Sequence, residues 1–246
     1  MAKSERILCI SDLHLNDQQP EIFHAFKVFM QEQASKAQAL YILGDFFNIW
    51  IGDDDPADFT AKVKQELLTL ANSGTKIYLM HGNRDFLLGS SFCNFCQVQL
   101  INEPFVLECF GSSYLLIHGD SLCTRDVGYM DFRTMVRNPV WQQDFLSKSL
   151  TERRTFANQA RQQSKAMSSN KPEDIMDVSS EEVVSLMQEY KQEILVHGHT
   201  HRPNIHAVDL EAGKGKRIVL GDWGQSGWYL ELSPEGHELI SFAIQA

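Results

Sequence analysis

Five short apolar runs along the chain each end in a cluster of Gly, Asp, His or Asn residues. The runs are Ile7–Ile10, Ala39–Leu43, Lys76–Met80, Ser113–Ile117 and Glu193–Val196. Short, continuous apolar runs bounded by polar clusters are typical of strands that are buried in a sheet. Because each cluster directly follows its strand, the same kind of chemistry recurs at five strand ends.

Between the first three runs, apolar residues recur at helical spacing over Pro20–Ser35 and Pro56–Asn72. The order strand, helix, strand, helix, strand predicts βαβ units with parallel pairing. Farther along, Phe105–Glu108 and Ser113–Ile117 flank Gly111 and predict a hairpin. Four more β segments separated by Gly-rich turns are expected, at Ile205–Leu210, Arg217–Leu220, Trp228–Leu232 and Glu238–Ile244. The pattern predicts an α/β fold in which two packed sheets carry helices outside and the polar clusters gather along one edge.

Residues 122–171 depart from this alternation of strands and helices, because they contain almost no glycine and few β-branched runs. We expect a helical insertion, a lid, within a single domain of residues 1–246. The apolar residues that recur there at helical spacing are Phe132, Met135, Val136, Trp141 and Phe145. After the insertion, Ser179 to Glu182 has the form of a capping box that opens a helix to Tyr190.

Composition excludes several classes of protein. The chain has 246 residues, of which 43% are hydrophobic, which indicates a packed core. A formal net charge of −10 disfavours bulk attraction to nucleic acid, so we expect no nucleic-acid partner. The N-terminal apolar run is too short for a signal sequence, which predicts a cytoplasmic protein. The five cysteines are expected to be reduced, and Cys93 and Cys96 form a lone C-x-x-C without the second pair typical of a zinc site.

Charge is unevenly distributed. Residues 122–171 contain nine Lys and Arg against four Asp and Glu, on a body that is otherwise acidic. Such a cationic segment is either a solvated helical pair or a binding site for an anionic substrate or an anionic membrane surface.

The strand-end clusters contain more metal-ligand side chains than one ion can use. An aspartate and a histidine two residues apart point to the same side of an extended chain. The candidate ligands are Asp12, His14, Asp45, Asn83, His118, His199 and His201. We therefore predict a two-ion site in which Asp45 bridges the ions. A donor set of oxygen and nitrogen without thiolate suits Mn²⁺ or Fe, with Zn²⁺ possible, and the residues alone do not choose among these metals. Two such ions can hold a hydroxide and clamp phosphoryl oxygens.

The motifs D-x-H, G-D, G-N-x-D, H-G-D and G-H-T-H resemble those of the calcineurin-like metallophosphoesterases, and the resemblance covers nearly the whole chain. It implies that Asp12, His14 and His201 complete the coordination of one ion. Asn83, His118 and His199 would complete the other. His197 is then left to lie behind the ligands. The catalytic residues that this implies are Asp45, Asn83, Arg84 and His118.

Arg84 indicates which kind of phosphate bond the site would cleave. Many members of that family carry a histidine at this position, which resembles a proton donor for an alkoxide leaving group. Arginine stays charged at neutral pH and cannot serve as a general acid. Its guanidinium suits a second phosphate, so Arg84 favours cleavage of a pyrophosphate bond. The alternative is that Arg84 only pairs with Asp85 or with the surrounding carboxylates.

Longer matches resemble the UDP-diacylglucosamine diphosphatase family of lipid A synthesis in Gram-negative bacteria. They cover Trp50–Asp54, His81–Gly89, His118–Thr124, Ile175–Val178 and His197–Pro203. The resemblance implies hydrolysis of UDP-2,3-diacylglucosamine to UMP and 2,3-diacylglucosamine 1-phosphate. It also implies two Mn²⁺ per chain, ahead of Fe, Zn²⁺ or Mg²⁺, and a peripheral position on the cytoplasmic face of the inner membrane. The implied substrate contacts are Asn83, Arg84, Asp126, Ser164, Ser168, Lys171 and His199. Ser168 departs from the more usual Asn.

In this interpretation the basic residues of the insertion would face the diphosphate and lipid head groups. Its apolar residues would line a groove for two acyl chains. Other metallophosphoesterases are the alternative, namely a dinucleoside polyphosphate hydrolase, a nuclease or a phosphatase. A non-catalytic scaffold is disfavoured because all seven ligand positions are filled. We expect the chain to act as a monomer.

Overall fold

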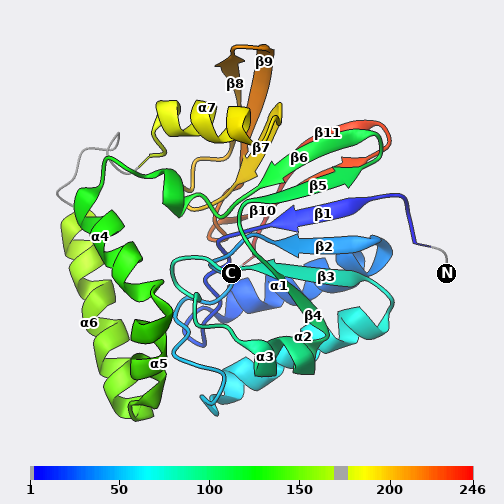
Figure 1. The fold of residues 1–246 in the computed structure, drawn as a ribbon. Helices are drawn as coiled ribbons and strands as arrows, with labels where there is room; N and C mark the ends of the chain where they lie inside the picture. The colour runs from blue at the N-terminus through cyan, green and yellow to red at the C-terminus, as the bar shows by residue number, and fades with distance from the viewer. Residues whose placement is uncertain (1–2, 169–176, 246) are drawn as a thin grey trace.

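The computed structural model describes residues 3–168 and 177–245, and these residues form two β-sheets with helices on their outer faces (Figure 1). The first sheet has the strand order β11-β10-β1-β2-β3-β4 and the second has β5-β6-β7-β9-β8. The strands are β1 (Ile7–Ile10), β2 (Ala39–Ile42), β3 (Lys76–Met80), β4 (Val98–Ile101), β5 (Phe105–Cys109), β6 (Ser112–Leu116), β7 (Ile194–His197), β8 (Asn204–Leu210), β9 (Gly213–Val219), β10 (Ser226–Ser233) and β11 (Gly236–Ala243). The predicted α/β fold with two sheets is confirmed.

Parallel pairing brings the predicted strand ends to one edge. Strands β1, β2, β3 and β4 are parallel neighbours, and β6, β7 and β9 are parallel neighbours in the second sheet. The predicted hairpin forms, because β5 pairs antiparallel with β6. β10 pairs antiparallel with β1 and so closes the first sheet with a strand from the far end of the chain.

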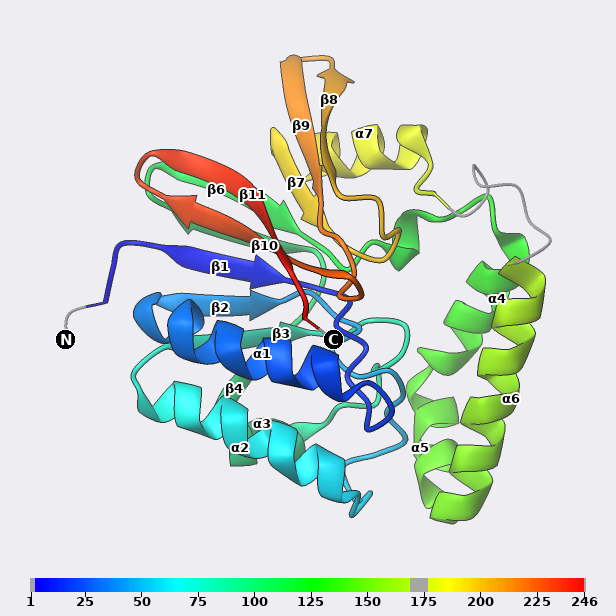
Figure 2. The ribbon, with the colours of Figure 1, turned by 180° about the vertical axis from the view of Figure 1, so that it is seen from behind.

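Three apolar layers hold these elements together. One lies between the sheets and contains Tyr41, Leu116 and Leu230. A second joins the outer face of the first sheet to α1 (Pro20–Glu32), α2 (Asp58–Asn72) and α3 (Ser90–Cys96). The third joins the second sheet to α7 (Ser180–Glu189), which lies over β7 to β9 (Figure 2). The order of layers is helix, sheet, sheet, helix.

The predicted helical character of the insertion is also observed. It consists of α4 (Val127–Val136), α5 (Pro139–Ser147) and α6 (Leu150–Ser168), called here the helical segment. These helices stand apart from the sheets and beside their common edge in both views (Figures 1 and 2). Trp141, Phe145 and Phe156 pack together between α5 and α6, with Trp141 and Phe145 stacked at 4.9 Å between ring centroids.

Buried polar contacts attach this segment to the body. Arg153 of α6 is only 3% exposed, and it donates to the Ile51 carbonyl at 2.7 Å and to Asp54 at 2.8 Å. Arg154 forms an ion pair with Asp55. The expectation that the basic residues of the segment face the diphosphate and the lipid head groups is wrong for Arg153, because its guanidinium is buried against the body.

Some local expectations are also wrong. The helix at Ser180 has no side-chain capping bond, because the Ser179 hydroxyl pairs with that of Thr124 at 2.9 Å. Met135 is 42% exposed and does not belong to the apolar interior of the segment. Elements α3 and β4 lie in a stretch for which the sequence predicted no element. All five cysteines are free thiols, as expected. Within the described residues, no helix is long and apolar enough to cross a bilayer.

Candidate active site

Most of the candidate metal ligands have a left-handed backbone conformation, which is uncommon outside glycine. Eight described non-Gly residues have positive φ, and five of them are candidate ligands, namely Asp12, His14, Asp45, His199 and His201. Each such residue costs roughly 1–3 kcal/mol, and this kind of strain concentrates at functional sites. The tight turns leave no room for side chains nearby, since a Cβ on Gly82 would lie 2.1 Å from the backbone nitrogen of Asp45.

The first predicted ligand set forms a compact cluster. One ligand atom from each of Asp12, His14 and His201 lies within 4.8 Å of the others. The Nε2 atoms of His14 and His201 are 3.3 Å apart. Ser11 and the backbone N–H of His199 donate to Oδ2 of Asp12 at 2.6 and 2.8 Å. Oδ1 of Asp12 is left facing the two imidazoles.

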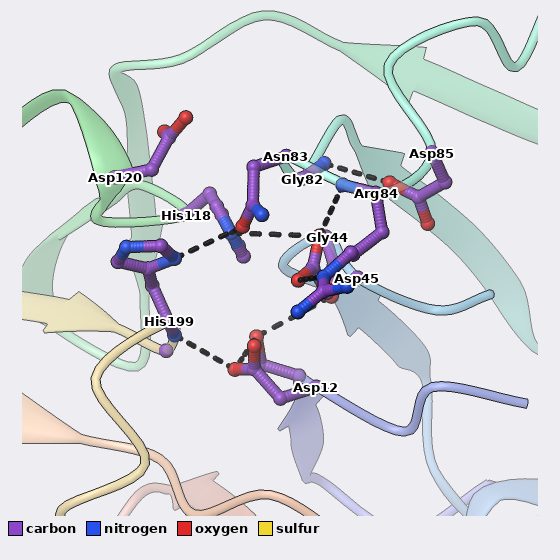
Figure 3. A network of polar contacts seen from close by, with 12 residues as sticks. Asp12, Gly44, Asp45, Gly82, Asn83, Arg84, Asp85, His118, Asp120 and His199 are labelled. Atoms are coloured by element: carbon purple, nitrogen blue, oxygen red, sulfur yellow. Dashed lines mark hydrogen bonds and ion pairs between the residues drawn. The ribbon is translucent and has the colours of Figure 1, made fainter. Parts of the chain in front are cut away.

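The second predicted set meets at one oxygen. Oδ1 of Asn83 lies 3.0 Å from Nε2 of His118 and 3.0 Å from Nδ1 of His199 (Figure 3). The other ring nitrogen of His118, Nδ1, donates to the Leu43 carbonyl at 2.8 Å, which fixes the ring with Nε2 toward the site. Such a contact orients a metal-binding imidazole.

Asp45 lies between Asp12 of the first set and Asn83 and His118 of the second (Figure 3). It is 2% exposed, with Oδ2 3.8 Å from Nδ1 of His14 and Oδ1 3.7 Å from Nε2 of His118. The backbone N–H of Arg84 donates to Oδ1 at 2.8 Å. Each carboxylate oxygen therefore faces a different ligand set, which is the arrangement that a bridging carboxylate requires.

Asp85 holds the two central loops together. It is fully buried, and it accepts backbone N–H groups from Gly82 at 2.8 Å, from Phe46 at 2.8 Å and from Phe47 at 3.3 Å. These bonds join the loop after β2 to the loop after β3. Backbone donors use both oxygens of Asp85, and no ion pair joins it to the Arg84 guanidinium among the described residues. Nε of Arg84 instead lies 3.8 Å from Oδ2 of Asp45, so pairing with a surrounding carboxylate is the part of that alternative that the structure supports.

Burial and charge set the protonation of the site. Burial raises the pKa of Asp45, and burial lowers the pKa of His14 and of His199, so these two imidazoles are neutral at pH 7. Burial also opposes the charge on His118, but the carboxylates of Asp45 and Asp12 outweigh it and raise the pKa of that imidazole. A cation placed here would displace the proton of His118.

The residues present fit a divalent metal site. Among the described residues, Oδ1 of Asp12 and Nδ1 of His14 are buried without a hydrogen-bond partner. Buried polar atoms are otherwise almost always satisfied, so two buried atoms without a hydrogen-bond partner in one cluster fit a site that binds a cation. The donors are carboxylate, amide oxygen and imidazole, which suit first-row divalent metals.

A cavity of about 540 Å³ opens from this cluster toward the helical segment. The cluster side is lined by polar residues that include His14, Asp45, Asn83, Arg84 and His199. The far side is lined by Phe86, Phe132, Trp141, Phe145 and Phe156. Arg161 lines the cavity as well, and burial together with the nearby Arg84 lowers the pKa of its guanidinium. The cavity is therefore polar and cationic at one end and aromatic at the other.

The structure places the predicted substrate contacts as follows. Asp126 and Ser164 line the cavity with Asn83, Arg84 and His199. Ser168 is at the end of α6, where only the backbone is described, and Lys171 lies outside the described residues. Val136 is buried and, like Met135, does not line the cavity, so three of the five predicted stripe residues do.

His197 and Glu103 complete the surroundings of the ligands. His197 is fully buried behind the site, and its Nδ1 donates to the Gly198 carbonyl at 2.8 Å. Glu103 accepts the backbone N–H of His118 at 2.9 Å. The sequence analysis did not identify Glu103, because the residue belongs to no metal-ligand motif and its contact spans fifteen residues.

Comparison with known proteins agrees with this geometry. The model of the calcineurin-like phosphoesterase family matches residues 5–203. A UDP-2,3-diacylglucosamine hydrolase of Hahella chejuensis is 47% identical over 97% of this chain and 98% of its own. The corresponding hydrolase of Cellvibrio japonicus is 48% identical over 96% of this chain and 99% of its own. That of Pseudomonas aeruginosa is 46% identical over 97% of this chain and 99% of its own. The chain therefore belongs to the calcineurin-like phosphoesterase family and, within it, to the family of the UDP-2,3-diacylglucosamine hydrolases.

Proposed function

We propose that this protein hydrolyses the pyrophosphate bond of UDP-2,3-diacylglucosamine to UMP and 2,3-diacylglucosamine 1-phosphate, a step of lipid A biosynthesis. The observation that carries the proposal is one cavity that joins a carboxylate–imidazole cluster to an aromatic wall. The cluster suits a phosphoric anhydride, and the wall suits acyl chains. The relatives that cover 96–97% of the chain carry the corresponding name.

We assign one ion to Asp12, His14 and His201 and the other to Asn83, His118 and His199, with Asp45 between them. When bound, two such ions lower the pKa of water and neutralise phosphoryl charge. Asp85 and the Leu43 carbonyl hold Asp45, Asn83 and His118 in place before substrate arrives, so these ligands need little rearrangement. We propose Mn²⁺ as the ion.

Arg84 would hold the second phosphate. Its backbone N–H is fixed on Asp45, while its side chain is 30% exposed at the cavity, and the nearest Asp45 oxygen is 3.8 Å from Nε, too far for a hydrogen bond. The guanidinium is therefore free to form short bonds with a phosphate. Because UMP or a sugar phosphate leaves as a stable anion, the reaction needs no general acid at this position. Asp126 and Ser164 are proposed to contact the same substrate, together with Ser168 and Lys171.

The helical segment would act as the lid over the acyl chains. Phe132, Trp141, Phe145 and Phe156 face the cavity from α4, α5 and α6. A groove of this kind binds apolar chains by removing their surface from water, at about 25 cal/mol per Å². We propose that this wall selects lipid-linked substrates over soluble nucleotides.

The experiment compares substrates on purified protein with added Mn²⁺. The protein should release UMP from UDP-2,3-diacylglucosamine and should cleave diadenosine tetraphosphate, a model phosphodiester and a phosphomonoester much more slowly. Arg84→Met should lower kcat/KM on the lipid substrate by about 10²-fold, as expected for a lost charged contact to a phosphate. Preference for diadenosine tetraphosphate would contradict the proposal and favour the dinucleoside polyphosphate hydrolase alternative.

We also propose that the protein works at the surface of an anionic membrane, on the cytoplasmic face of the inner membrane. Of the eight exposed large hydrophobic side chains found among the described residues, four lie on α4 and α5, namely Val127, Met135, Val140 and Leu146. Val140 is 75% exposed, and several exposed apolar side chains on two neighbouring helices fit a surface that contacts a membrane. The double variant V127S/V140S should reduce sedimentation with phosphatidylglycerol vesicles and leave the metal content unchanged.

A further inference from the structure

Helix α4 is bonded to the loops that carry the metal ligands. Arg133 donates from Nε to Oδ2 of Asp120 at 2.9 Å and from Nη2 to Oε1 of Glu103 at 2.7 Å. The Tyr129 hydroxyl donates to the same Asp120 oxygen at 2.5 Å. One helix therefore supplies three donors to two carboxylates of the body.

Both carboxylates act on His118. Glu103 uses its second oxygen, Oε2, to accept the backbone N–H of His118 at 2.9 Å. Asp120 lies two residues after His118, at the start of a short 3₁₀ helix. Arg133 thus bonds the carboxylate that holds the backbone N–H of His118 and a second carboxylate two residues farther along the same loop, and the ring of His118 supplies a ligand atom to the proposed second ion.

A second arginine reaches the loop of Asn83. Arg137 donates from Nη2 to the Gly82 carbonyl at 2.9 Å, directly before Asn83 in the chain. Its guanidinium also lies 5.5 Å from the centroid of the Phe86 ring. Because Oδ1 of Asn83 contacts both His118 and His199, a shift of this loop would disturb the whole second ligand set.

These contacts differ from ordinary surface ion pairs. Asp120 is fully buried, and the side chains of Arg133, Arg137 and Glu103 are only 22%, 21% and 16% exposed. Water screens exposed pairs, but a buried carboxylate that loses its cation keeps the full cost of its desolvation. The network is therefore stable only when α4 is docked.

We propose that Arg133 and Arg137 are positioning residues that couple docking of the helical segment to assembly of the second ion's ligands, Asn83, His118 and His199. The inference rests on the two-ion site proposed above, and it adds that the two ligand sets differ in their dependence on the helical segment. The set made by Asp12, His14 and His201 has no such contact with α4 among the described residues, so only one half of the site depends on the lid.

Coupling of this kind is reciprocal. If docking of α4 raises the affinity of the second ion by a given factor, binding of that ion must stabilise the docked helix by the same factor. Binding at the first set should leave α4 unaffected. The amide hydrogens of α4 should therefore exchange more slowly only when the second ion is bound.

The test uses the full chain and Mn²⁺ alone, measured by calorimetric titration and by electron paramagnetic resonance of the coupled Mn²⁺ pair. Arg133→Met should weaken the second binding step by about 10–100-fold, the usual effect of losing a group that orients a ligand. It should leave the first step within about threefold. The exchange-coupled signal should be lost at Mn²⁺ concentrations that saturate the wild type. Arg133→Lys should recover only part of the affinity, because one ammonium cannot bond both carboxylates in the geometry of the guanidinium.

Arg154→Met is the matched control. Arg154 belongs to the same helical segment and pairs with Asp55, ten residues after Asp45 in the loop that follows β2, and among the described residues it forms no hydrogen bond or ion pair with a candidate metal ligand or with the loops of Asn83 and His118. This variant should bind both ions as the wild type does. If Arg133→Met is poorly folded, Arg137→Met keeps the apolar contact with Phe86 and should show the same selective loss.

The outcomes separate the two proposals. Two ions bound with unchanged affinity in folded Arg133→Met and Arg137→Met would overturn the coupling and leave the two-ion site intact. An equal loss in Arg154→Met would also overturn it, because any lid contact would then have the same effect. A wild-type chain that binds one ion would overturn the two-ion site itself.

Discussion

Asp85 offers a direct test of how the site is held together. It is fully buried, and its two oxygens accept three backbone N–H groups, from Phe46, Phe47 and Gly82. Asp85→Asn keeps the shape of the side chain but leaves one acceptor oxygen. The favoured orientation keeps the oxygen on Phe46 and Phe47, so that the new amide group faces the N–H of Gly82.

The magnitude follows from these bonds. One buried backbone donor is left unsatisfied, which costs about 1–3 kcal/mol, and the remaining bonds lose their charge assistance. We expect the free energy of unfolding to fall by about 3 kcal/mol in urea denaturation of the metal-free protein. Because the lost bond holds the loop of Asn83, Mn²⁺ affinity should also fall by about 10–100-fold.

Asp53→Asn is the control for this substitution. Asp53 likewise accepts two backbone N–H groups, from Gly89 and Phe92, and it also bonds Trp50, but it holds no candidate metal ligand. It should lower stability to a similar extent and leave Mn²⁺ affinity unchanged. A change of less than about 0.5 kcal/mol for Asp85→Asn, or an equal loss of Mn²⁺ affinity in Asp53→Asn, would refute the reasoning.

Three further outcomes are expected. Mn²⁺ affinity should rise with pH up to about 9, because neighbouring carboxylates outweigh burial and raise the pKa of His118 to about 9, and the ion must displace that proton. Calorimetry in buffers of different ionisation enthalpy should show that Mn²⁺ binding releases a proton. Binding without proton release would count against His118 as a ligand. Arg153→Met should lower the free energy of unfolding by about 1–3 kcal/mol without changing Mn²⁺ affinity, because it leaves the buried carbonyl of Ile51 without its donor. A melting temperature equal to that of the wild type would contradict this loss of stability. Trp141→Ala should lower kcat/KM on the diacylated substrate by about 10–100-fold and leave the slow cleavage of a soluble UDP-sugar unchanged. An equal loss on both substrates would show that the aromatic wall does not select acyl chains.

The sequence predicted the fold class and the ligand clusters well, because both depend on local signals. An apolar run followed by Gly and Asp marks a buried strand and its polar end, and parallel pairing then gathers such ends. The strand pairing itself was beyond this reasoning. Nothing local in Ser226–Ser233 indicates that β10 pairs with β1 more than two hundred residues away.

The contacts that organise the ligands were also hidden in the sequence. The bond from Arg133 to Glu103 spans thirty residues, and neither residue belongs to a metal-ligand motif. The capping box at Ser179 failed because a tertiary partner, Thr124, took the hydroxyl that a local pattern assigned to the helix. Left-handed backbone at Asp12 and Asp45 has only a weak signal in the residue types, because Asp adopts this conformation more often than most residues but still rarely.

Anomalous diffraction from crystals soaked in Mn²⁺ tests the central claim most directly. The account predicts two peaks on either side of Asp45, one bound by Asp12, His14 and His201 and the other by Asn83, His118 and His199. A single peak, or a pair of peaks that Asp45 does not bridge, would contradict it.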